Sequence, residues 1–132
     1  MSKITYKIDK FTDFSGYTRE FIFCAVSIEN IDSKDDMKVL RIGVSVQNPK
    51  DAEIDTELGK RISYGKAMKN KSCCGIIVSN NKGMINTKVV NALLEQEAEY
   101  FKINPGKYLK GYNKDRELYN SNSDLYYDKM GL

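Results

Sequence analysis

Arginines beside predicted structural elements are the residues of this sequence best suited to bind a ligand. Arg61 lies next to the apolar face of a helix expected from Ile54 to Asn70, where its stem can lie along that face. Alternatively, its planar guanidinium is free to bind a phosphate or to stack on a base, uses for which arginine is better shaped than lysine. Arg19, at the start of an expected strand, and Arg116, in the C-terminal extension, are further candidates. Each of these two alone is typical of a solvated surface residue.

The start of the same helix is a second place where ligand chemistry is expected. The segment Asn48-Pro49-Lys50-Asp51 leads from an alternating strand towards Asp51 or Asp55 as the helix cap. A strand that leads through a short loop to a helix N-terminus is a good place to bind an anion.

Little in the sequence favours catalysis. Histidine is absent, which removes nucleophile pairs with an imidazole base and histidine-ligated metals. The three cysteines, Cys24, Cys73 and Cys74, include no C-x-x-C pair, which argues against a zinc site or a disulfide framework. Glu97 is expected within an apolar helical face, where a pair with an arginine or lysine of the first helix or the sheet is favoured over a role as catalytic acid. We therefore predict no catalytic residue, no metal site and no cofactor.

Apolar periodicity predicts an α+β fold with a largely antiparallel sheet in the order βββαβα and two helices packed on it. Alternating residues predict strands over 4–10, 17–30 and 37–47, and a short apolar run predicts a fourth over 71–79. The second strand is apolar on both faces, so we expect it to be central. A second helix is expected from about residue 86 to 104, and Pro105 either stops it or begins a third helix.

The length of 132 residues, with 41% hydrophobic and 30% charged residues, fits a single domain over 1–132. The Asn- and Ser-rich stretch from about 113 to 132 is interpreted as a tail or an arm that a partner orders. No apolar run approaches the roughly 20 residues that would span a bilayer, so no membrane contact is expected. The net charge of +3 allows nucleic acid as a partner but does not demand it.

Two stripes run along the first predicted helix. Apolar residues at three- and four-residue steps form one stripe, and small residues form the other. A small-residue stripe lets another backbone approach closely, and we expect it to meet the second helix of the same chain or, alternatively, a helix of a second copy. The apolar stripe comprises Ile54, Leu58, Ile62, Gly65 and Met68, and the small-residue stripe comprises Thr56, Gly59, Ser63 and Ala67.

The segment GVSVQNPKDAEIDTELGKRISYGKAMKN, from Gly43 to Asn70, resembles a pattern of small bacteriophage proteins. In length and in order of elements the whole chain resembles the first family of Thoeris anti-defence proteins. That resemblance implies a sponge rather than an enzyme, which binds a cyclic ADP-ribose isomer in the cytoplasm of the infected bacterium and blocks Thoeris immunity. It also implies a homodimer that can assemble into a hexamer, and possible binding of cyclic oligonucleotides.

The resemblance places no ligand contact on a numbered residue, so the site is predicted from chemistry. We expect Arg61 or Arg19 on a pyrophosphate, Tyr64 or Phe101 stacked on a base, and Arg116 closing over the site. Two alternatives stay open. One is a nucleic-acid-binding protein that uses the tyrosines and lysines of GKYLKGYNKDR. The other is a metal-dependent enzyme that cleaves nucleotides with Glu97, Asp51 and Asp55.

Overall fold

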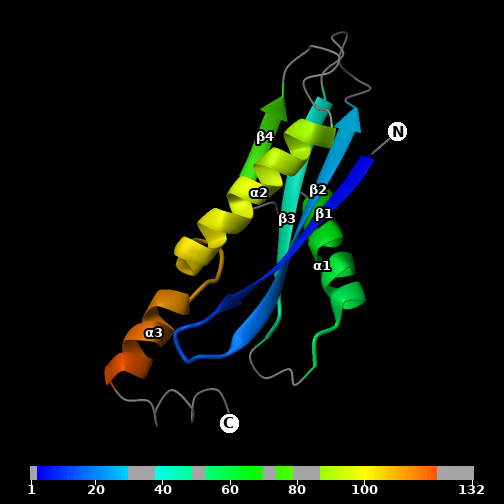
Figure 1. Cartoon of the computed structure of the whole chain (residues 1–132). Coiled ribbons are helices and arrows are strands. Elements are labelled where there is room, and N and C mark those ends of the chain that lie inside the picture. The colour runs from blue at the N-terminus through cyan, green and yellow to red at the C-terminus, as the bar shows by residue number, and fades with distance from the viewer. Residues whose placement is uncertain (1–2, 30–37, 49–52, 70–73, 79–86, 122–132) are drawn as a thin grey trace.

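Four antiparallel strands form one sheet in the order β1-β2-β3-β4 (Figure 1). The computed structural model describes residues 3–29, 38–48, 53–69, 74–78 and 87–121. The strands are β1 (Lys3–Thr12), β2 (Thr18–Glu29), β3 (Lys38–Val46) and β4 (Cys74–Val78). The helices are α1 (Thr56–Met68), α2 (Thr87–Ile103), the short 3-10 helix η1 (Pro105–Lys107) and α3 (Tyr112–Ser121). The predicted α+β class is confirmed.

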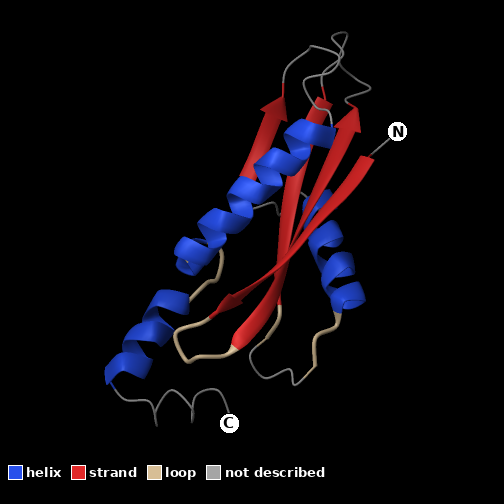
Figure 2. Ribbon diagram, viewed as in Figure 1, coloured by secondary structure: helices blue, strands red, loops and turns tan. Residues whose placement is uncertain are grey.

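The two long helices cover opposite faces of the sheet, and the strand register explains which side chains each helix meets. Cys24 of β2 is paired with Tyr6 of β1 and Gly43 of β3, and directly opposite residues point to the same face. This face carries α1, whose Ala67 packs with Cys24. The other face carries α2 (Figure 2). Strand β2 lies between β1 and β3, so its predicted central position is confirmed.

The face that carries α2 holds the aromatic core of the molecule. Phe101 of α2 is stacked on Phe21 with ring centroids 4.2 Å apart and meets the edge of Phe11 at 4.9 Å. Such pairs contribute about 0.5–1.5 kcal/mol beyond the burial of their area. Leu94 and Ala98 of α2 complete the contact with the sheet. Val90, Leu94 and Phe101 of α2 therefore face inward, as its periodicity predicts, whereas Val89 and Tyr100 of the predicted apolar face remain exposed.

The face that carries α1 is packed differently, because helix and sheet approach until only small side chains fit between them. A Cβ atom added to Gly43 of β3 would lie 2.2 Å from the carbonyl oxygen of Ser63 and 2.6 Å from the amide nitrogen of Ala67. Ser63 and Ala67 have no exposed surface. The small-residue stripe of α1 thus packs on the sheet of its own chain, and the expectation that it meets a second helix is wrong.

This close contact turns the apolar stripe of α1 away from the core. Ile54, Leu58, Ile62 and Met68 retain 43, 43, 42 and 38% of their surface exposed. Periodicity therefore identifies a helix at this position, and the structure places its apolar stripe on the outward side.

The chain after α2 is more regular than the predicted tail. Pro105 opens a single 3-10 turn, and Gly111, with φ of +82°, separates that turn from α3. Tyr112, the first residue of α3, is buried and meets the ring of Phe14 at 5.1 Å. Residues 112–121 are therefore helical, so the alternative of a third helix after Pro105 is confirmed in part, although that helix begins at Tyr112 and replaces the start of the tail expected from about residue 113. Residues 122–132 lie outside the described part of the chain.

Candidate functional site

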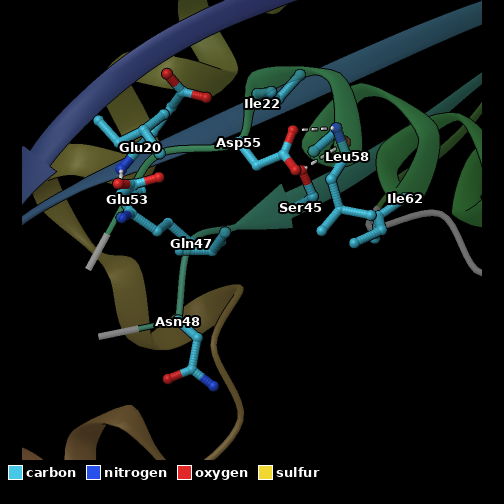
Figure 3. Close-up of a pocket in the computed structure, with 12 residues that line it drawn as sticks. Glu20, Ile22, Ser45, Gln47, Asn48, Glu53, Asp55, Leu58 and Ile62 are labelled. Atoms are coloured by element: carbon cyan, nitrogen blue, oxygen red, sulfur yellow. Dashed lines mark hydrogen bonds between the residues drawn. The ribbon is translucent and has the colours of Figure 1, made fainter. Parts of the chain in front are cut away.

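A pocket lies where β3 leads into α1. Asp55 caps the helix as the sequence predicts, because its Oδ1 accepts a hydrogen bond from the backbone N–H of Leu58 at 3.0 Å (Figure 3). Thr56 donates its hydroxyl to the carboxylate of Glu20, a residue that is 8% exposed, at 3.1 Å. The alternative cap, Asp51, lies outside the described residues.

The pocket has a volume of about 210 Å³, less than the 300–1,000 Å³ typical of small-molecule sites. The carboxylates of Glu20, Glu53 and Asp55 line it together with Leu58 and Ile62 of α1. These carboxylates would repel an anionic ligand. The carboxylate of Asp55 also occupies a backbone N–H of the first helical turn, that of Leu58, which an anion would otherwise use. The pocket carboxylates disfavour the anion that the sequence predicts at this helix N-terminus.

Two predicted site residues, Arg61 and Tyr64, lie together on the accessible side of α1. Arg61 is exposed, and Tyr64 is half-buried beside Tyr6 of β1. The Nζ of Lys60 lies 5.4 Å from the centre of the Tyr6 ring. Burial raises the pKa of the Tyr6 hydroxyl, with smaller contributions from Cys24, Tyr64 and Glu57. We call Tyr6, Lys60, Arg61 and Tyr64 the tyrosine–arginine surface.

Arg19 is part of the framework around the β1–β2 turn. Its Nε donates to the carbonyl oxygen of Gln47 at 2.8 Å, and its guanidinium lies 3.7 Å from the carboxylate of Asp13 and 5.4 Å from the centre of the Phe11 ring. The side chain is 11% exposed. This guanidinium links the β1–β2 turn to the end of β3, so few of its N–H groups remain to bind a ligand.

Arg116 is exposed on α3, close to the same turn. Burial raises the pKa of the Tyr112 hydroxyl, and the positive charges of Arg19 and Arg116 act in the opposite direction. These two predicted arginines therefore lie near one another around Tyr112, while Arg61 lies on the opposite face of the sheet, on α1.

Phe101 has no exposed surface and is enclosed by core aromatics, among them Tyr108 at 5.1 Å. Stacking on a base would require opening the core, so its predicted role does not fit this geometry. The sequence cannot show that α1 and α2 lie on opposite faces, and this arrangement separates Tyr64 from Phe101. The five predicted residues do not converge on one site.

Glu97 also has a different partner from the one expected. Its carboxylate accepts a hydrogen bond from the hydroxyl of Tyr108 at 2.7 Å, not from a basic residue of α1 or the sheet. Tyr108 follows α2 closely in the chain, and the turn at Pro105 brings it back over the helix. Tyr108 and the buried Tyr112 are thus engaged internally, and they are both of the tyrosines of GKYLKGYNKDR invoked for stacking on nucleic acid.

Sequence reasoning missed Tyr6 and Glu20. A signal was available for Tyr6, because its strand alternates and places an aromatic between Ile4 and Ile8. Glu20 precedes an apolar run, but nothing local shows that β2 carries it to the start of α1.

Within residues 3–29, 38–48, 53–69, 74–78 and 87–121, no group of three acidic or cysteine side chains could hold a metal ion. The helices of this described part include none long and apolar enough to cross a membrane. Comparison of the chain with protein-family models, with curated proteins and with solved structures gives no match.

Proposed function

We propose that the protein is a binding protein that sequesters a cyclic ADP-ribose-type nucleotide without cleaving it, and thereby blocks Thoeris immunity in the host cytoplasm. The identity of the nucleotide and the oligomeric form, a homodimer or hexamer, rest on the resemblance of the segment Gly43 to Asn70. The proposal for the binding surface rests on one observation, the tyrosine–arginine surface of α1 and β1.

This surface combines the chemistry that a nucleotide requires. The exposed guanidinium of Arg61 can form a bidentate contact with a pyrophosphate. The half-buried ring of Tyr64 is the aromatic offered to adenine, and stacking on an aromatic contributes about 1–3 kcal/mol per base. Lys60 adds a second positive charge within reach of Tyr6. By contrast, the acidic pocket at the start of α1 would repel the phosphates.

Mass spectrometry tests the proposal directly. The purified full-length chain is mixed with a set of cyclic ADP-ribose isomers and cyclic oligonucleotides, filtered, and heat-denatured to release what it holds. We expect recovery of an intact cyclic nucleotide. Recovery of a cleaved product would support the metal-dependent enzyme instead. Retention of nothing, together with steeply salt-dependent binding of DNA or RNA, would support nucleic-acid binding.

A pair of arginine variants locates the site. Arg61→Gln should reduce nucleotide retention at least tenfold, the effect of losing about 1.4 kcal/mol of binding free energy. Arg116→Gln is the matched control, because Arg116 is also an exposed helical arginine but lies on α3. Equal retention by the two variants would refute the placement of the ligand on the tyrosine–arginine surface.

A further inference from the structure

The pocket at the start of α1 contains a buried carboxylate that has no positive partner. Glu20 is 8% exposed, and it lies on the face of the sheet that carries α1, because Ile22 and Cys24 follow it at steps of two along β2. Its carboxylate accepts a hydrogen bond from the neutral hydroxyl of Thr56, 3.1 Å from one oxygen and 3.3 Å from the other. Within the described part of the chain, no lysine or arginine forms an ion pair with it. A buried carboxylate is costly until a positive group accompanies it.

The rest of the pocket lining combines two more carboxylates with an apolar wall. Glu53 and Asp55 are exposed, so they mark the mouth of the pocket, whereas the carboxylate of β2 lies at its inner end. No ion pair joins either of them to a basic residue of the described segments. The apolar part of the lining is formed by Ile22, Leu58 and Ile62 (Figure 3). Negative charge is therefore present at both ends of a pocket whose wall is largely aliphatic.

The inner end of this pocket is held in place by the protein itself. The backbone N–H of Glu20 donates to Oε1 of Gln47 at 3.0 Å, and the backbone N–H of Gln47 donates to the carbonyl oxygen of Glu20 at 2.8 Å. The hydroxyl of Ser45 donates to the carbonyl oxygen of Gly59 at 2.8 Å and fixes α1 to β3 beside the pocket. A site whose walls are ordered before binding loses little entropy when a ligand enters.

The three pocket carboxylates do not converge on one point. Among the residues that the structure describes, no group of three acidic or cysteine side chains could hold a metal ion. A ligand that reaches these carboxylates must therefore carry its positive charges apart, on a chain that suits the aliphatic wall. The volume of about 210 Å³ equals that of about seven water molecules in the liquid, at about 30 Å³ each, so it holds about seven non-hydrogen atoms.

We infer that this pocket binds a short aliphatic diamine, with about four or five methylene groups between its two ammonium groups. One ammonium group donates charge-assisted hydrogen bonds to Glu20, and the other donates to Glu53 or Asp55 at the mouth. The methylene chain lies against Leu58 and Ile62 and removes their apolar surface from water. None of the four residues of the tyrosine–arginine surface lines the pocket, so this site is separate from the one proposed for the nucleotide.

Isothermal titration calorimetry of the full-length chain with putrescine, the four-carbon diamine, tests the inference. Putrescine should bind in the micromolar to millimolar range, and butylamine, which has one ammonium group, should bind at least tenfold more weakly. The butanediol with a hydroxyl group at each end of the chain should not bind, because it carries no charge. Glu20→Gln should raise the dissociation constant for putrescine at least tenfold, since glutamine keeps the size of the side chain but removes its charge.

Thermal unfolding gives a second readout and checks that the variant folds. Glu20→Gln should raise the Tm of the free protein, because the glutamine still accepts a hydrogen bond from Thr56 and leaves no buried charge without a partner. Putrescine should raise the Tm of the wild type but not that of the variant. Glu57→Gln is the matched control, since Glu57 is also a carboxylate of the first turn of α1 but lies 3.7 Å from Lys60 and outside the pocket.

The two variants decide whether the carboxylate of β2 is the one that binds. Glu57→Gln should leave the affinity for putrescine unchanged. Equal affinities of Glu20→Gln and Glu57→Gln for putrescine would overturn the inference, and so would a wild type that gives no binding heat. Butylamine as tight as putrescine would refute the assignment of a diamine, because one ammonium group, such as that of a lysine side chain, would then suffice.

Discussion

Replacing Gly43 by alanine should separate α1 from the sheet. The added Cβ would lie 2.2 Å from the carbonyl oxygen of Ser63 and 2.6 Å from the amide nitrogen of Ala67, against 3.4 Å or more for ordinary contact. Both atoms belong to the helix backbone, so a change of side-chain rotamer cannot relieve the clash. The helix must instead move away by about 1 Å, a gap that forfeits a quarter to a half of the dispersion attraction across the contact.

The cost has two parts. Overpacking of this kind costs about 1–3 kcal/mol. The Ser45 hydroxyl donates a hydrogen bond of 2.8 Å to the carbonyl oxygen of Gly59, and retreat of the helix would stretch this bond. Its loss costs about 1 kcal/mol. Alanine regains about 0.4–1 kcal/mol by restricting the unfolded chain. We therefore expect Gly43→Ala to lower the free energy of unfolding by about 2 kcal/mol.

Urea unfolding followed by circular dichroism measures the effect. With a slope of about 2 kcal/mol per molar, the midpoint of the urea transition should fall by about 1 M. Gly59→Ala is the graded control. Its added Cβ would meet the Cδ1 atom of Ile22 at 2.7 Å, but this atom is the movable end of a side chain. Alanine also has a higher helix propensity than glycine, so the free energy of unfolding should change by no more than about 1 kcal/mol. If Gly43→Ala were no more destabilising than Gly59→Ala, the close contact of α1 with β3 would be refuted.

Three further predictions concern single side chains. Burial acts to raise the pKa of Asp9, but hydrogen bonds from Lys102 and from the backbone of Lys10 lower it below the usual value of 3.8. The ionised Asp9 therefore stabilises the folded protein above pH 3.8, and this contribution is lost as the pH falls through the lower pKa of the folded state. Lys102→Gln should raise the Asp9 pKa, as an NMR titration will show. Burial raises the pKa of the Cys24 thiol to about 11 despite a hydrogen bond with Tyr6, so iodoacetamide at pH 8 should not alkylate Cys24 in the folded protein, as peptide mass spectrometry will show. Asp13→Ala should destabilise by about 2–4 kcal/mol in thermal unfolding, because Asp13 accepts three hydrogen bonds within the β1–β2 turn.

The elements that could be predicted from the sequence are those whose signal is local. Asp55 was one of two predicted caps, because a carboxylate before an apolar-periodic segment is the usual start of a helix. The second helix was expected from about residue 86 to 104 and is found at Thr87–Ile103. The central position of β2 followed from apolar residues on both of its faces.

The orientation of α1 could not be predicted, because periodicity shows that two stripes exist but not which one faces the sheet. That choice depends on Gly43, a residue of another strand whose missing side chain makes room for the helix backbone. The five predicted site residues do not lie together for a related reason. Residue type alone made Phe101 as plausible a stacking partner as Tyr64, and only the placement of their helices on opposite faces distinguishes them.

The close packing of α1 and its exposed apolar stripe are consequences of the same arrangement. Because the side of α1 that faces Gly43 accepts only small residues, the large apolar side chains of the helix cannot enter the core of their own chain. A helix that served only to cover the sheet would be most soluble with polar residues on its outward side. Leu58 and Ile62 instead stand there. The arrangement that brings α1 against the sheet therefore also leaves these apolar side chains on the accessible side of the helix.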